Sequence, residues 1–368
     1  MAAARIYTAP ADPATEGFAD LVLAGGGMKG VAYVGVLEAL HRRGYRTHPR
    51  VAGTSVGALV GSVIATGASP ERVRELMLAM PFALMKDRGG DRLPIAGAIK
   101  SLWLDGGRYV TDALLDWIDD NVPELHGLTF GELRRTRADE MAARGVDWNP
   151  ALDPLVILAT DVTRGELVRF PADFARYAGT SGAARDPDDA LVLDAVRASI
   201  SVPLYFEPTR IGASEFVDGG VLANYAVDAF DRPDAPLQPR WPTFGFTLTA
   251  HDDAHQLGDE LFDAISPLPV GPLLAHGGRV ASALIGTLIA GQDRENARRW
   301  WMAHRTVEID TSGTGIVEFD LSDERREAVV ERGRAATAAF LDGPWQDGAD
   351  RAGWGFDGRA RYKLPAAR

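Results

Sequence analysis

The sequence predicts an α/β fold in which helices flank a central, mainly parallel sheet. Two successive units of strand, glycine turn and helix predict it. In the first unit, an apolar run at 21–24 is closed by three glycines, and a helix-spaced apolar stretch follows as far as Gly44. In the second, a short strand at 50–52 ends in a glycine–serine turn, and a helix continues to residue 66. This alternation is typical of parallel strands joined by crossover helices.

The rest of the chain is assigned from the same periodicities. Further strands are expected at 154–160, 166–170 (a hairpin with the preceding strand), 215–217, 243–249 and 306–310. Further helices are expected at 112–121 with Thr111 as N-cap, at 193–199, within 273–301, and at 323–340 with Ser322 as N-cap. Irregular segments are expected at 81–105 (a lid or mobile insertion), 136–150 and 178–189. We expect a loose arm at 1–16, one domain at 17–342 and an irregular tail at 343–368.

Composition excludes several classes of function. The 368 residues are 46% apolar and 24% charged, which is typical of a globular protein with a sizeable core. The net charge of -12 disfavours nucleic acid as a partner, because phosphate binding needs a concentrated basic face. The absence of cysteine removes disulfides, thiolate metal sites and cysteine nucleophiles. With neither a signal peptide nor a membrane-spanning apolar run, the sequence predicts a cytoplasmic location, with export by a route that needs no signal peptide as the alternative.

The strongest local motif is Gly53-Thr54-Ser55-Val56-Gly57. Between a strand and a helix, the pattern G-x-S-x-G forms a tight turn that presents the serine hydroxyl above the sheet. Glycine is expected on both sides, because a side chain there would clash with the neighbouring strand or helix. In a chain with 40 glycines the pattern also arises by chance, but here it has the strand and the helix that it requires. Ser55 is therefore the predicted nucleophile.

The glycine loop Gly25-Gly26-Gly27-Met28-Lys29-Gly30 has three interpretations. A dinucleotide site would need an acidic residue about 20 positions later, and none is present there. A Walker A loop would need a Gly-Lys-Ser/Thr ending, which the loop lacks. An oxyanion hole fits better, because consecutive glycines let backbone N–H groups converge beside the serine turn. Lys29 either adds positive charge there or is a solvated side chain.

The base that would activate Ser55 has two kinds of candidate. His251 and His255 follow a late strand, where a serine triad places its histidine, but a solvated loop is an equally good interpretation. Asp218 ends a strand and is followed by Gly219 and Gly220, which allow another backbone to approach closely. A buried aspartate in contact with the serine would have the basicity to deprotonate it. Taken alone, however, Asp-Gly-Gly is also a common turn.

In this order, the glycine loop, the serine turn and the Asp-Gly-Gly motif resemble those of the patatin-like phospholipase family. The segment 198–206 and the region of Asn224 extend the similarity, which covers roughly residues 18–250 and continues more weakly to about 340. The resemblance implies a patatin-like three-layer fold. It also implies hydrolysis of lipid esters, of phospholipase A or lysophospholipase type, by a Ser55–Asp218 dyad without histidine.

The resemblance extends to the surroundings of the dyad. It implies oxyanion donors in the loop 25–30, near Gly26, Gly27 and Met28, and supporting roles for Gly53, Gly57, Gly219 and Gly220. It implies no metal and no cofactor, a phospholipid or other acyl lipid as substrate, and room for peripheral contact with a membrane. It does not fix the lipid head group, the acyl chain or the oligomeric state.

Two other functions are compatible with the sequence. The same dyad would serve an esterase or thioesterase that acts on soluble acyl substrates, which a comparison of short and long acyl chains separates from a lipase. A patatin-like scaffold kept for binding, or an effector that needs an activator, is the other alternative. Labelling by a fluorophosphonate probe would reject a scaffold without enzymatic activity.

Overall fold

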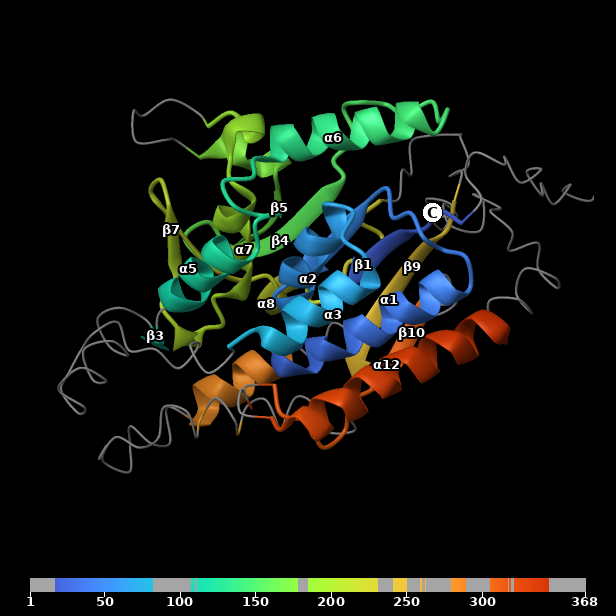
Figure 1. Cartoon of the computed structure of the whole chain (residues 1–368). Helices are drawn as coiled ribbons and strands as arrows, with labels where there is room; N and C mark the ends of the chain where they lie inside the picture. Colours follow the sequence, from blue (N-terminus) through green and yellow to red (C-terminus); the bar gives the residue numbers. More distant parts are fainter. Residues whose placement is uncertain are drawn as a thin grey trace, which may run out of the picture.

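The structure is a computed structural model that describes residues 17–81, 107–109, 111–177, 185–230, 241–249, 279–288, 305–316, 318 and 321–343, with isolated positions at 259 and 262. Its centre is an eight-stranded mixed sheet flanked by helices (Figure 1). The expected arm at 1–16, nearly all of the lid at 81–105, most of the helix within 273–301 and the tail after 343 lie outside the described residues. The same holds for His251 and His255.

Five strands form the parallel part of the sheet, in the order β10, β9, β1, β2 and β4. Beyond β4 the sheet continues with β8 and β7, each antiparallel to its neighbour, and β5 forms a hairpin with β4. A small second sheet pairs β3 with β6. The strands are β1 (Asp20–Leu23), β2 (Val51–Thr54), β3 (Gly107–Tyr109), β4 (Leu155–Asp161), β5 (Glu166–Phe170), β6 (Leu204–Phe206), β7 (Thr209–Ile211), β8 (Ser214–Asp218), β9 (Thr243–Thr249) and β10 (Thr306–Asp310).

The helices connect these strands and cover the sheet. The α-helices are α1 (Ala32–Arg42), α2 (Val56–Ala65), α3 (Pro70–Ala79), α5 (Asp112–Asn121), α6 (Phe130–Ala143), α7 (Val192–Ile200), α8 (Gly220–Ala223) and α12 (Asp323–Asp342). Short 3-10 turns are η1 (Gly27–Val31), η4 (Ala172–Arg176) and η5 (Pro187–Asp189). Residues 279–288 are also helical. No helix of the described segments is long and apolar enough to cross a bilayer.

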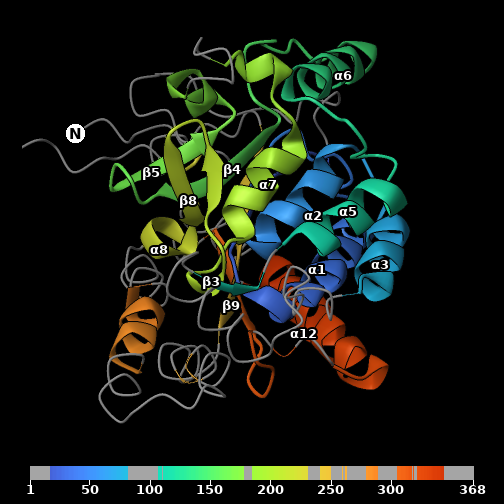
Figure 2. The same cartoon turned by 90° about the vertical axis from the view of Figure 1, so that its left-hand side faces the viewer.

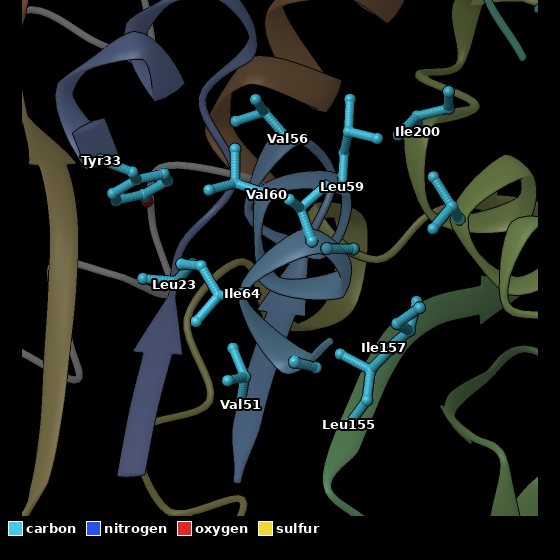
Figure 3. Packing of buried hydrophobic residues seen from close by; sticks show 14 of the residues in the cluster. Leu23, Tyr33, Val51, Val56, Leu59, Val60, Ile64, Leu155, Ile157 and Ile200 are labelled. Atoms are coloured by element: carbon cyan, nitrogen blue, oxygen red, sulfur yellow. The ribbon is translucent and has the colours of Figure 1, made fainter. Parts of the chain in front are cut away.

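Alternating side chains of the central strands build the core on both faces of the sheet. In β1, Leu21 and Leu23 face the main core, whereas Val22 points to a smaller cluster on the other side. The main core is filled by α2, whose Leu59 and Ile64 pack over β1, β2 and β4 (Figure 3). Because α2 is buried along its whole length, the residue at its start is held rigidly.

A close helix crossing joins the C-terminal part of the chain to the core. Helix α12 lies along α1 (Figure 1). A Cβ added to Gly35 of α1 would lie 1.9 Å from the carbonyl oxygen of Val330, and one added to Gly333 of α12 would lie 2.1 Å from that of Ala32. Glycine at both positions therefore lets the two backbones touch. Together with the parallel pairing of β10 and β9, this contact makes residues 306–342 part of the same fold.

Most of the predicted elements are confirmed, including the hairpin of β4 and β5 and the cap of α12, where the Ser322 side chain accepts from the N–H of Arg325. Two predictions are wrong. The expected loop at 136–150 is helical as far as residue 143, because α6 begins at a Thr129–Glu132 capping box and exposes a mostly polar surface. Thr111 precedes α5 but does not cap it: its backbone is already helical and its side chain makes no cap hydrogen bond.

Candidate active site

Ser55 occupies a strained turn between β2 and α2. Its φ of 55° and ψ of -127° are rare for a residue with a side chain. The flanking glycines make the turn tight, since a Cβ on Gly53 would lie 2.2 Å from the carbonyl oxygen of Gly57. A Cβ on Gly57 would in turn lie 2.3 Å from that of Leu23 in β1. Ser55 thus stands at the N-terminus of α2, where the helix dipole favours negative charge.

Asp218 ends β8, and its backbone N–H, its carbonyl and its carboxylate are all hydrogen-bonded. Its backbone N–H donates to the carbonyl of Ser201 at 2.8 Å, and its carbonyl accepts from the Thr160 hydroxyl at 3.1 Å. Its carboxylate accepts the N–H of Gly220 at 2.7 Å, and the side chain of Ser55 is close enough to influence its pKa. Burial raises the pKa of Asp218 to about 6, although the Ser55 side chain and the Gly220 N–H oppose that rise.

Strand β4 brings the serine and the aspartate together. Its Leu158 pairs with Thr54 of β2 on one side, and its Ala159 pairs with Asp218 of β8 on the other. The serine turn is also linked to the helix that follows Asp218, because the Thr54 hydroxyl donates to the carbonyl of Ala223 in α8. Gly219 packs directly against the backbone of β4, since a Cβ there would lie 2.5 Å from the carbonyl oxygen of Leu158. Ser55 and Asp218 are 7% and 3% exposed, so water has little access to their contact.

Ser199, near the end of α7, holds the serine turn through a hydrogen bond to the backbone of Ser55. Its hydroxyl accepts the backbone N–H of Ser55 at 2.9 Å and donates to the carbonyl of Leu158 at 2.6 Å. The side chain is fully buried, and α7 lies beside α2 (Figure 2). Sequence reasoning did not identify Ser199 as a site residue. Its signal was the segment 198–206, which carried similarity without an assigned role.

The glycine loop lies at the end of β1, next to Ser55. A Cβ on Gly25 would lie 3.1 Å from the Cβ of Ser55 and 2.4 Å from the side-chain oxygen of Asn224. Two buried contacts fix where the loop begins: the Tyr33 hydroxyl donates to the carbonyl of Ala24, and the N–H of Gly25 donates to the carbonyl of Asn224. Asn224 is thus a further residue at the site for which the sequence indicated no role.

The amides of the glycine loop are not equivalent. The N–H of Met28 donates to the carbonyl of Ile316 at 3.0 Å, and that of Lys29 to the carbonyl of Gly26 at 3.1 Å. Among the hydrogen bonds of the described residues, the amides of Gly26 and Gly27 have no partner. These two, rather than Met28, are therefore available to an oxyanion. Lys29 is 1% exposed, so the interpretation of a solvated lysine is wrong.

The structure describes three histidines, and their surroundings differ from that of the dyad. His48 precedes β2 and is buried; its Nδ1 hydrogen-bonds to the carbonyl of Ala19, just before β1, and burial lowers its pKa to about 3. His41 lies beside it, and His126 is exposed near Asp119. The described residues contain no group of three or more acidic or histidine side chains able to hold a metal ion.

A family model described as patatin-like phospholipase matches residues 21–231. This stretch makes up more than half of the chain and contains both Ser55 and Asp218. The chain belongs to the patatin-like phospholipase family. The family shares the α/β fold described above, with its central sheet flanked by helices.

The chain is also similar to curated proteins and to solved structures. An uncharacterized protein, YqhO, of Bacillus subtilis is 27% identical over 338 residues, which cover 88% of this chain and 98% of that protein. An uncharacterized NTE family protein of Mycobacterium bovis is 27% identical, but the match covers only 55% of this chain and 42% of that protein. The crystal structure of VipD from Legionella pneumophila aligns over 88% of this chain and 67% of its own, with a TM-score of 0.46 and 17% identity.

Proposed function

We propose that this protein is a serine hydrolase that cleaves carboxylic ester bonds of lipids, of phospholipase A or lysophospholipase type, with Ser55 as nucleophile and Asp218 as base. One observation carries the proposal: the Ser55 side chain interacts with the buried carboxylate of Asp218 and lowers its pKa, while burial raises that pKa to about 6. A carboxylate with such a pKa is charged at neutral pH and is a better proton acceptor than an exposed one. Membership of the patatin-like phospholipase family supports a lipid as substrate.

The proposed reaction has two steps that use the same residues. Ser55 Oγ attacks the ester carbonyl while Asp218 takes its proton, and the leaving alcohol then receives that proton as the acyl-enzyme forms. Water next attacks the acyl-enzyme, with Asp218 again accepting a proton and returning it to Ser55. The amides of Gly26 and Gly27 are the proposed donors to both oxyanions. The start of α2 adds positive potential next to the nucleophile.

A labelling experiment tests this assignment. The wild-type chain is expected to react covalently with a fluorophosphonate probe and to release fatty acid from phospholipid and lysophospholipid vesicles. Ser55→Ala should abolish both reactions, because no nucleophile remains. Asp218→Asn should lower the rate of each by at least about a thousandfold, because the amide cannot accept the proton. Unchanged labelling of a folded Ser55→Ala variant would disprove the assignment.

The acyl chain length separates lipids from soluble substrates. We expect kcat/KM to rise from acetyl to long-chain p-nitrophenyl esters, and to rise further when the substrate is presented in vesicles. An enzyme for soluble acyl groups would instead favour the short esters. An inactive wild-type chain that still labels with the probe would indicate a requirement for an activator.

A further inference from the structure

The chain carries a turn outside the family match that contacts the glycine loop directly. The family model ends at residue 231, whereas Thr311–Ile316 follow β10. The carbonyl of Ile316 accepts the N–H of Met28 at 3.0 Å. A Cβ on Gly27, whose φ is +55°, would lie 2.0 Å from that same oxygen. The turn therefore approaches the loop as closely as a glycine permits, and it fixes the orientation of the peptide after Gly27.

The position of Ile316 is set by a network that begins at the sheet and ends on α12. At its start, the backbone N–H and the hydroxyl of Thr311 both donate to the carbonyl of Thr249 in β9, at 2.8 and 3.0 Å. At its end, the Glu318 carboxylate accepts the N–H of Gly315 at 3.0 Å and pairs with Arg325 in the first turn of α12. Arg325 also donates to the carbonyl of Gly313 at 2.8 Å.

We propose that Glu318 and Arg325 are positioning residues for the oxyanion hole and act through the Ile316 carbonyl. The carbonyl binds the Met28 amide and so turns the preceding peptides, with the amides of Gly26 and Gly27, toward Ser55. A loop of three consecutive glycines has high conformational freedom, so an external contact is needed to hold one arrangement. The inference rests on the proposed ester hydrolysis, because it assigns an oxyanion role to the loop.

The ion pair at the other end of α12 provides a matched control. Arg43, directly after α1, pairs with Asp342, and both pairs are similarly exposed: 44% and 48% for Arg43 and Asp342, 46% and 35% for Arg325 and Glu318. Of these two pairs, Glu318–Arg325 connects to the glycine loop, through Gly315 and Ile316, and Arg43–Asp342 does not. The general stabilising effect of an exposed ion pair is small, so a difference between the two pairs reports on the loop.

The experiment compares Glu318→Ala, Glu318→Gln and Asp342→Ala in the full chain. Glu318→Ala frees the turn, so kcat is expected to fall by about tenfold with KM changed by less than about twofold. Glu318→Gln keeps an oxygen for the Gly315 amide and should restore most of the rate. Asp342→Ala should match the wild type. Hydrogen exchange of the peptide 25–31 should be faster in Glu318→Ala alone.

Two results would overturn the inference. One is a Glu318→Ala variant with wild-type kcat and wild-type exchange in the loop; the other is an equal loss of kcat in Glu318→Ala and Asp342→Ala. Failure of the proposed function would look different, because the wild-type chain itself would neither hydrolyse esters nor react with a fluorophosphonate. In that case the exchange of the peptide 25–31 still decides whether Glu318 positions the loop.

Discussion

Asp218 is buried next to Ser55, the proposed nucleophile. The N–H of Gly220 and the side chain of Ser55 both favour the charged carboxylate and partly compensate the loss of solvent around it. Their effect is smaller than that of burial, so the pKa stays near 6. The same conditions that make the carboxylate a better base also make its charge costly for the folded state. Activity and stability should therefore depend on pH in opposite directions.

The pH dependence of catalysis follows from this pKa. Only the ionised carboxylate can accept the Ser55 proton, so kcat/KM should fall about tenfold per pH unit below pH 6 and level off above it. A pH profile of ester hydrolysis measures this directly. An inflection near pH 4, the ordinary value for an aspartate, would show that the carboxylate is not desolvated in the working enzyme.

Stability should show the complementary trend. The folded-state pKa of about 6 lies above the ordinary 3.8, so the stabilising contribution of protonated Asp218 is complete below pH 3.8 and is lost as pH rises through 6. The shift corresponds to about 3 kcal/mol at neutral pH. The amide side chain introduced in the Asp218→Asn variant does not titrate. The Tm of this variant minus the Tm of the wild type should therefore increase between pH 4 and pH 7. Parallel Tm curves over this range would contradict the prediction.

Ser199 determines how well the strained serine turn is held. Ser199→Ala removes the acceptor of the Ser55 N–H and the donor to Leu158. We expect kcat to fall by about a hundredfold with KM nearly unchanged, because substrate binding does not use this hydroxyl. The matched control is Ser62→Ala, since Ser62 is equally buried in α2 but donates only to Ala58 of its own helix. Comparable losses in both variants would show a general packing effect.

At the scale of elements, local signals in the sequence determined most of the fold. Strands β1, β2 and β4 are short apolar runs bounded by turn residues, and each was predicted to within about two residues. Polar surface helices were harder, because α6 buries only a few residues along its length. Helix α3 and the short strands β6 and β7 were not assigned. Strands β6 and β7 are only three residues long, which is too short for a local pattern to show. Helix α3, in contrast, does carry a local start signal, with Ser69 as N-cap and Pro70 as its first residue.

The site was only partly predictable as well. The serine turn and the aspartate carry local motifs, but their partners come from elsewhere in the chain. Ser199 acts from 144 positions away, and its sequence neighbourhood does not indicate a bond to Ser55. The contact of Ile316 with the glycine loop depends on how β10 and α12 dock, so no local motif reports it. The close contact between α1 and α12 likewise cannot be inferred from the sequence of either helix alone.

The α1–α12 crossing leads to a prediction at this scale. Gly333→Ala places a methyl group about 2 Å from the carbonyl of Ala32, so α12 must shift away from α1. We expect a loss of roughly 1–3 kcal/mol in the free energy of unfolding, measured by urea denaturation. Ala335→Val, on the exposed face of α12, adds bulk without this clash and should change stability by less than about 0.5 kcal/mol. Equal effects in both variants would argue against the close crossing.

At the scale of the whole molecule, the fold that holds the proposed site extends beyond the family match. Ser55 and Asp218 fall within residues 21–231, but β9, β10 and α12 complete the sheet and cover α1. β9 lies between β1 and β10, so the strand that leads into the glycine loop is central only because the C-terminal part of the chain is present. The site is thus assembled from both ends of the described chain.

Removing that C-terminal part should therefore abolish the fold as well as the activity. A chain that ends at residue 305 lacks β10 and α12, which exposes the apolar face of α1 and leaves β9 as an open edge strand. We expect it to aggregate, to lose the cooperative thermal transition in circular dichroism, and to give no fluorophosphonate labelling. The control ends at residue 343, directly after α12, and should keep both the transition and the labelling. A shortened chain that still labels at Ser55 would show that residues 21–231 and their nearest strands form the site unaided.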